Sequence, residues 1–289
     1  MASTAAATRL TEQHRQAQVA NQRSFLSQFL ALWPLLNVTD LDRYTPGWLN
    51  AVLRLIDVFR QDSADIAEDY YRRFREIEAP ESAPDMPELV FEGVRDFPTQ
   101  RILRQVARGD RNVTPVDLDR VLIDWAQDRV AARNSLIVTG PVNIKSKVKR
   151  ATPPEQAARS ALVEASGAAS RHVLNGGRKT LLTVVQNDNV ALGWARVTDG
   201  DPCAFCAMLA SRGPAYKSRQ QASFQPHDHC ACSVEPVFSR EAAWPGRGRE
   251  FQQLWNDNIR GQYSGKDAIR AFRRLYEQQQ RELREAEAA

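Results

Sequence analysis

All four cysteines of this 289-residue chain lie within 30 consecutive positions, together with two of its four histidines. Isolated cysteines usually pack as small apolar residues, but packing gives no reason for this spacing. Thiolate and imidazole groups are the ligands that zinc prefers, and a C-x-x-C turn directs two sulfurs at one ion. The segment therefore predicts a zinc-stabilised loop. Its candidate ligands are Cys203, Cys206, His227, His229, Cys230 and Cys232.

Six candidates exceed the four places of a tetrahedral zinc ion. Cys203, Cys206 and Cys230 are the expected ligands, and Cys232 and His227 compete for the fourth place. Four protein ligands would make the site structural, whereas an open place holding water would indicate catalysis. A redox role for the C-x-x-C pair is a further alternative. We disfavour it because the preceding residues are not typical of the strand that leads into a thioredoxin motif.

The composition is that of a globular protein. Hydrophobic residues make up 43% and charged residues 26% of the chain, which excludes wholesale disorder. The longest apolar stretch, 29–36, contains Pro34 and is too short to span a membrane. The first 16 residues lack the apolar core of a secretory signal. We therefore expect a reducing cytoplasm, where clustered cysteines are more often metal ligands or catalytic groups than disulfides.

The first half of the chain has the apolar spacing of amphipathic helices. The pattern predicts one helix over 8–32 and a second that begins at Thr45-Pro46 and ends near residue 79. Two more helical stretches are predicted over 89–108 and 114–125. These residues form a predicted helical domain, 1–150.

A change of composition between Gly140 and Pro154 marks the predicted domain boundary. This stretch holds a basic run, which we interpret as a solvated linker; the alternative is a contact with DNA or with an acidic partner. The candidate DNA contacts are Lys145, Lys147, Lys149 and Arg150. The net charge of only +4 gives little support to nucleic-acid binding.

The predicted second domain, 151–289, is mixed. A capping box at Thr152 and Glu155 predicts a helix as far as Leu174, before Gly176-Gly177. Short β-branched stretches predict strands over 180–185, 192–197 and 233–238, and two amphipathic helices follow. The expected fold class is α+β. A mainly helical N-terminal domain precedes a small mixed α/β domain with the zinc-stabilised loop and C-terminal amphipathic helices.

The segment 197–232 resembles the Mu F-like minor head proteins of tailed bacteriophages. The family pattern is an aspartate followed by C-x-x-C, a glycine and an aromatic residue, and H-x-x-C-x-C before a strand. The matching residues are Asp199, Cys203, Cys206, Gly213, Tyr216, His227, Cys230 and Cys232. The preceding predicted helix, Glu155 to Leu174, is also similar to the family's opening elements, and so is Trp194. Ala231 stands where the family usually has a basic residue, and His229 is an additional imidazole.

The resemblance implies a low-copy head protein of the virion, assembled in the bacterial host cytoplasm and associated with the portal. It implies a role in head assembly or in DNA packaging and ejection. The expected partners are the portal protein and the capsid or scaffold protein, with a non-specific DNA contact as a further option and no membrane partner.

Two other functions stay open at this stage. In a capsid maturation protease, Cys230 or Cys232 would be the nucleophile and His227 or His229 the base. Neighbours on one strand rarely form such a pair, and the chain has no G-x-S-x-G elbow, so we favour a non-enzymatic role. In a DNA-binding zinc module, the basic run and the lysine and arginine at 217 and 219 would bind phosphates.

Overall fold

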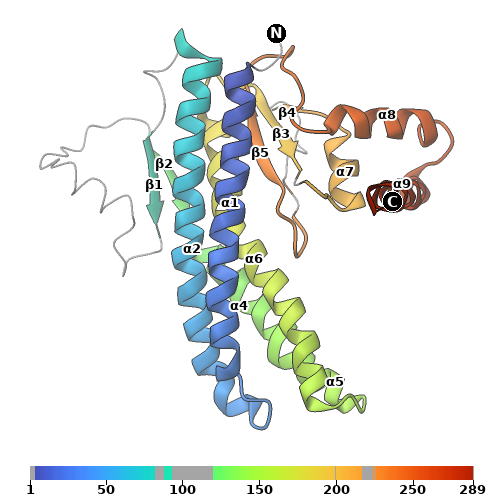
Figure 1. The fold of residues 1–289 in the computed structure, drawn as a ribbon. Coiled ribbons are helices and arrows are strands. Elements are labelled where there is room, and N and C mark those ends of the chain that lie inside the picture. Colours follow the sequence, from blue (N-terminus) through green and yellow to red (C-terminus); the bar gives the residue numbers. More distant parts are fainter. Residues whose placement is uncertain are drawn as a thin grey trace, which may run out of the picture.

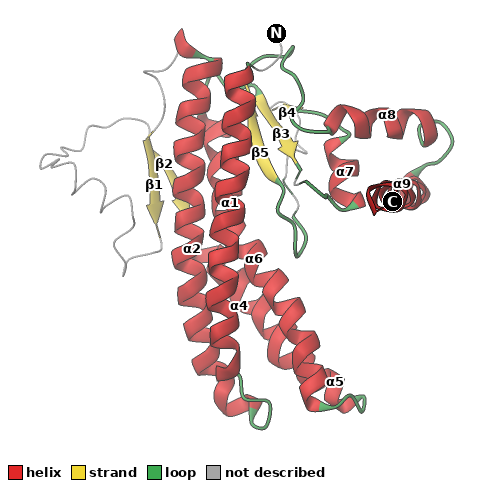
Figure 2. Ribbon diagram, viewed as in Figure 1, coloured by secondary structure: helices red, strands yellow, loops and turns green. Residues whose placement is uncertain are grey.

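The computed structural model describes residues 4–81, 88–92, 120–198, 200–216, 224 and 226–288. Three long helices dominate it: α1 (Ala5–Leu32), α2 (Leu41–Glu78) and α6 (Pro154–Asn187). The first two form an antiparallel hairpin against which α6 packs (Figure 1). The short strands lie beside this bundle (Figure 2). The predicted α+β class is confirmed at the level of a mainly helical protein with a few small strands.

The first two helices follow the apolar pattern of the sequence. Phe25 and Phe29 of α1 face Val52, Ile56 and other side chains of α2 in a buried core. The predicted start of α2 at Thr45-Pro46 is wrong, because the helix begins at Leu41. The Asp40 carboxylate accepts the Arg43 N–H at 3.2 Å and so caps the helix one turn earlier.

The predicted end of the helix at Leu174 is also wrong, because α6 continues through both glycines to Asn187. A Cβ atom at Gly176 would lie 2.1 Å from the Arg60 carbonyl oxygen of α2. The glycines therefore permit a close helix contact rather than a break. The predicted strand over 180–185 belongs to this helix. At the start of α6, Pro153 occupies the N-cap position and no side chain makes a capping hydrogen bond, so the predicted capping box is not formed.

A parallel pair, β1 (Glu88–Glu92) and β2 (Arg120–Asp124), stands where helices were predicted. Ile123 and Trp125 are buried against Ala64 of α2. Pairing between strands that are distant in the chain is a tertiary effect that local periodicity does not encode. The remaining parts of the two predicted helices, 93–108 and 114–119, lie outside the described residues.

The predicted boundary region is helical. Helix α4 (Ala126–Ile137) continues through the π-helical segment η3 (Val138–Val142) into α5 (Asn143–Lys149). Gly140 lies against the Trp48 ring. One core thus joins α1, α2, α4, α5 and the first half of α6. The division into 1–150 and 151–289 stays a prediction.

The predicted strands at 192–197 and 233–238 are confirmed as β3 (Gly193–Val197) and β5 (Ser233–Val237). They pair antiparallel, and β4 (Ala215–Tyr216) lies on the other edge of β3. Both predicted C-terminal helices are also confirmed, as α8 (Gly248–Asn258) and α9 (Gly265–Ala288). The short helix α7 (Ala204–Ala210), which was not predicted, shares a separate apolar core with them.

A buried polar network connects α1 to β5. The Thr11 hydroxyl donates to Glu235 at 2.6 Å and lies 2.8 Å from the Tyr70 hydroxyl. Glu235 is only 4% exposed. Burial raises the pKa of Glu235 to about 7, although the Thr11 hydrogen bond opposes this effect. In the folded protein the Glu235 carboxyl therefore keeps its proton up to about pH 7, well above the pH at which it ionises in the unfolded chain.

This shift predicts a pH-dependent stability. A carboxyl whose pKa is raised by folding stabilises the fold below its unfolded value of 4.5, and the benefit is lost as the pH rises through 7. Glu235→Gln keeps an oxygen for Thr11 but cannot ionise. Between pH 5 and pH 8 the wild type should lose about 2 kcal/mol of unfolding free energy relative to this variant. Urea unfolding at both pH values measures the difference, and the exposed Glu241→Gln serves as control. Parallel pH profiles for wild type and Glu235→Gln would contradict the raised pKa.

Candidate metal centre

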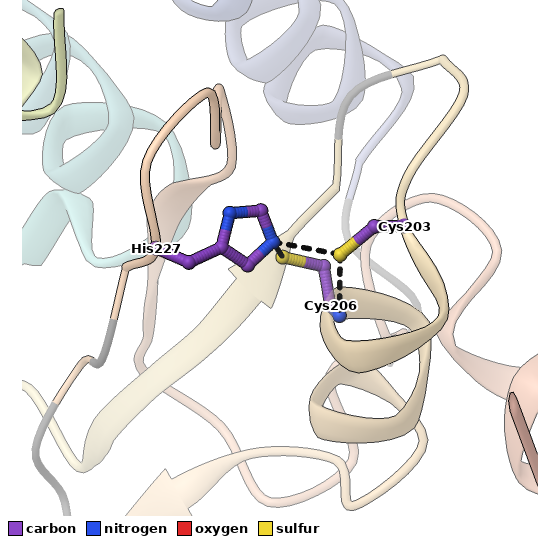
Figure 3. A group of neighbouring side chains, drawn as sticks. All are labelled: Cys203, Cys206 and His227. Atoms are coloured by element: carbon purple, nitrogen blue, oxygen red, sulfur yellow. Dashed lines mark hydrogen bonds between the residues drawn. The ribbon is translucent and has the colours of Figure 1, made fainter. Parts of the chain in front are cut away.

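Two segments that are more than 20 residues apart bring the candidate ligands together. Cys203 directly precedes α7 and Cys206 lies in its first turn, while Cys230 and Cys232 lie in the loop that leads into β5. The Cys203 sulfur caps α7 by accepting the Cys206 N–H at 3.4 Å. The turn thereby holds both side chains toward His227 (Figure 3).

The distances approach those of a metal-bound set. The Cys206 sulfur lies 3.6 Å from the Cys230 sulfur and 3.7 Å from His227 Nε2. Metal bonds of about 2.0–2.3 Å in a tetrahedron place ligand atoms about 3.3–3.8 Å apart. The Cys203 sulfur is closer to His227 Nε2, at 2.7 Å. The segment is therefore compact enough to enclose one ion with modest adjustment.

Five of the six predicted ligands fall into two overlapping groups. Cys203, Cys206 and His227 form one, and Cys206, Cys230 and Cys232 form the other; the ligand atoms of each lie within 4.8 Å of one another. Cys206 belongs to both groups and is the geometric centre of the site. Five atoms still compete for four places, and the binding of an ion stays a prediction.

His229 lies apart from this cluster. Its backbone has a φ of 64°, in the left-handed region, and its ring lies over Gly167 of α6. A Cβ atom at Gly167 would lie 2.3 Å from His229 Nε2. Within the described part of the chain, His229 is in neither group of metal-ligating atoms.

The two histidines make a matched pair for a binding experiment. His227→Gln should weaken zinc binding by roughly 10-fold or more, because it removes an imidazole nitrogen that faces two sulfurs. His229→Gln should leave the affinity unchanged within a factor of two or so, as expected for a group outside the coordination sphere. Competition with a chromophoric chelator measures both. Equal losses in the two variants would show that His229 also reaches the ion.

The thiols differ in burial and in proton affinity. Cys206, Cys230 and Cys232 are buried, whereas Cys203 is exposed. The hydrogen bond with the Cys206 thiol lowers the pKa of Cys203 to about 5 against the effect of burial, and a bond with the same thiol lowers the pKa of Cys230. The same hydrogen bonds with Cys203 and Cys230 raise the pKa of Cys206. Cys203 and Cys230 therefore favour the thiolate form that a metal requires, and Cys206 retains the proton that they share.

The His227 ring is oriented by its own neighbour. Its Nδ1–H donates to the Asp228 carbonyl at 2.6 Å, which leaves Nε2 toward the sulfurs. Arg171 of α6 binds the Asp228 carboxylate at 2.7 Å and fixes this turn to the bundle. Burial lowers the pKa of His227, but the hydrogen bonds with the Cys203 sulfur and the Asp228 carbonyl and the charge of the neighbouring thiols together outweigh burial and raise the pKa overall. Metal-bound histidines typically donate a hydrogen bond from the ring nitrogen that does not face the ion, as Nδ1 of His227 does here.

One residue of the site was missed by the sequence analysis. Arg178 of α6 donates from Nε to the Cys232 carbonyl at 2.9 Å and from Nη2 to the Cys230 carbonyl at 2.5 Å. Burial lowers the pKa of Arg178, and the thiols of Cys230 and Cys232 oppose this effect. No motif marks this residue, because its role depends on how α6 packs on the loop.

The lysines of the basic run lie on α5 and Arg150 is its C-cap, at the end of the bundle away from the sheet (Figure 1). Lys145 forms an ion pair with Asp42 and Lys147 with Glu164. Arg150 donates to the Ser146 hydroxyl. Ion pairing reduces the charge that two of the four candidates offer to phosphates, and DNA contact stays a prediction. The residues at 217 and 219 lie outside the described residues.

The described helices include none that is long and apolar enough to cross a membrane. Fold and site together define a mainly helical protein in which a small sheet and a short helix hold a cluster of thiols and one imidazole. The family model described as VG15 protein matches residues 2–258, so the chain belongs to the VG15 protein family.

A phage relative agrees with this assignment. The Gene 15 protein of Mycobacterium phage D29 is 29% identical over 163 residues, which are 40% of this chain and 59% of the relative. The match thus spans about three fifths of that protein's length. No solved structure matches the chain. The two matches identify a bacteriophage protein.

Proposed function

We propose that this protein is a Mu F-like minor head protein that assembles beside the portal and acts in head morphogenesis or in DNA packaging and ejection. The observation that carries the proposal is the ordered cysteine and histidine pattern, which the fold gathers at one point. The relationship to a phage protein supports it. The proposed partners are the portal protein and the capsid or scaffold protein, and the proposed location is the virion.

Zinc is the proposed ion of the site, with a structural role. Cys203 and Cys206 lie at the start of α7, and α7 packs on α8 and α9 through Ala207 and Met208. The other ligands lead into β5, which packs on α6. An ion shared between the two segments would therefore fix the C-terminal helices to the bundle.

We infer that a partner in the head binds the end of α9. Beyond Tyr276 this helix has no buried residue as far as 286, the last position whose exposure is described. Isolated helical turns are marginally stable in water, and packing usually provides most of their stability. A partner in the head would supply such packing.

Co-expression with the portal protein of the same phage tests the proposal. The tagged chain should retain the portal protein through size-exclusion chromatography, and it should be found by mass spectrometry in purified particles. A variant truncated after Tyr276 keeps the packed part of α9 and should bind less portal protein. Consistent absence of the chain from particles, together with no retention of portal protein, would refute the proposal.

A Cys/His hydrolase is the second candidate, because one contact favours it. Cys203 and His227 lie at hydrogen-bond distance, and the Asp228 carbonyl orients the imidazole. This is the geometry of a nucleophile and its base. However, three further thiols converge on the same place, which hydrolysis does not require. Capsid-protein cleavage that the wild type performs and Cys203→Ala abolishes would favour the hydrolase. No cleavage by the wild type would remove it.

A further inference from the structure

The guanidinium of Arg178 is enclosed between α6 and the ligand loop. The residue is 4% exposed. Its Nε and Nη2 atoms hold the carbonyl oxygens of Cys232 and Cys230, while Nη1 donates to Asn175 at 3.1 Å. One planar group thus binds both ends of the C-x-C segment and fixes the spacing of its sulfurs.

The charge of Arg178 has no carboxylate partner in the described part of the chain. Its hydrogen-bond acceptors are two backbone carbonyls and one amide, all neutral, and its guanidinium lies 5.3 Å from the centre of the Phe224 ring. A buried cation without an opposite charge is strongly unfavourable. The buried groups at hand that can carry negative charge are the thiols of the cluster.

The number of thiolates decides whether a zinc centre supplies that charge. Two thiolates with His227 and a water around Zn²⁺ give a neutral centre, three thiolates give −1 and four give −2. Only the last two compositions compensate a buried guanidinium. The buried charge of Arg178 therefore favours a ligand set with three or four thiolates, a choice that the sulfur distances alone do not make.

We propose that Arg178 is the counter-ion and the clamp of an anionic zinc–thiolate centre with at least three sulfur ligands. The inference rests on the proposed zinc site and adds its charge and a positioning residue. Arg178 does not touch the ion; it acts through the backbone of Cys230 and Cys232 and through its charge.

Three variants separate these contributions. Arg178→Met removes the charge and all donors, whereas Arg178→Lys keeps the charge and loses the planar fork. Arg159→Met is the matched control, because Arg159 is exposed on the same helix. The full-length proteins are titrated with Zn²⁺ against a chromophoric chelator. Titration with Co²⁺ then reports the thiolate ligands through the sulfur-to-metal charge-transfer absorption.

Arg178→Met should bind zinc roughly 10–100-fold more weakly than the wild type, as for other groups that support metal ligands. Arg178→Lys should recover part of the affinity, and Arg159→Met should equal the wild type. The wild-type cobalt spectrum should have an absorption intensity corresponding to three or four thiolates. A spectrum with two thiolates, or unchanged affinity in Arg178→Met, would overturn the inference.

Two further outcomes remain decisive. If Arg178→Met does not fold, the lysine variant decides: a folded Arg178→Lys with at least part of the wild-type affinity supports the charge role, and one that binds no zinc overturns it. A folded wild type that binds neither Zn²⁺ nor Co²⁺ refutes the proposed zinc site itself. If the wild type binds zinc and only the results for the Arg178 variants differ from those expected, the role of Arg178 is refuted and the proposed zinc site stands.

Discussion

Cys206→Ser should weaken zinc binding by more than about 100-fold, the largest effect of any single ligand substitution. Cys206 is the one sulfur that belongs to both groups of ligand atoms. Its replacement leaves no three of the remaining ligands in a compact set. The substitution should also lower the unfolding free energy of the zinc-loaded protein by several kcal/mol, since zinc binding contributes to folding. Chelator competition and urea unfolding in the presence of zinc measure the two effects.

Cys203→Ser is the control for this substitution. Cys203 is exposed and belongs to one group only, so its loss should reduce affinity less than the loss of Cys206. Addition of a strong chelator should remove the stability difference between the wild type and Cys206→Ser, because both are then metal-free. A Cys206→Ser protein that binds zinc as tightly as Cys203→Ser would contradict the central position of Cys206.

Gly176→Ala should destabilise the fold by about 3 kcal/mol, at the upper end of the cost of overpacking. The added Cβ atom would lie 2.1 Å from the Arg60 carbonyl oxygen, which is backbone and cannot rotate away. To accommodate it, α2 and α6 must separate, and these two helices pack on each other more extensively than any other described pair of elements. The midpoint of urea unfolding should fall accordingly, with little change in the slope.

Gly47→Ala is the matched control. Gly47 lies on the exposed side of α2, and a Cβ atom there meets nothing within 4 Å. This substitution should stabilise the protein by about 0.5–1 kcal/mol, since alanine is the better helix former. Equal stability of the two alanine variants would mean that α6 does not approach α2 as closely as the structure shows.

The long helices could be predicted because their apolar residues recur with a helical period. Both α1 and α2 follow from that signal, and so do the two amphipathic helices at the C-terminal end. Each buries one stripe against a neighbour, so the sequence itself contains the pattern. The strands β3 and β5 were found for a related reason, since they are short stretches that contain β-branched or aromatic residues.

The errors arise where tertiary contacts decide the local structure. Gly176 and Gly177 are common signals of a helix end, yet here they permit the approach of α2. Residues 88–92 and 120–124 form strands because they pair with each other across a long separation. Neither contact can be predicted from the local periodicity of apolar residues. The early start of α2 depends on a single capping carboxylate, that of Asp40.

The candidate site, too, could be predicted in part from local sequence and in part depends on tertiary contacts. Cysteine spacing was sufficient to predict that two distant segments belong to one site, because few other roles require that pattern. The spacing could not separate His227 from His229, since the two differ in the backbone turn that directs each ring. Nor could it identify Arg178, which reaches the loop from a different element.

Native mass spectrometry of the full chain, purified in the presence of zinc, tests the central claim most directly. We expect one zinc ion per chain in the folded wild type and none in Cys206→Ser, whose helical content should persist because most helices lie outside the site. A folded wild-type chain that carries no zinc would contradict the claim that these thiols form a metal centre.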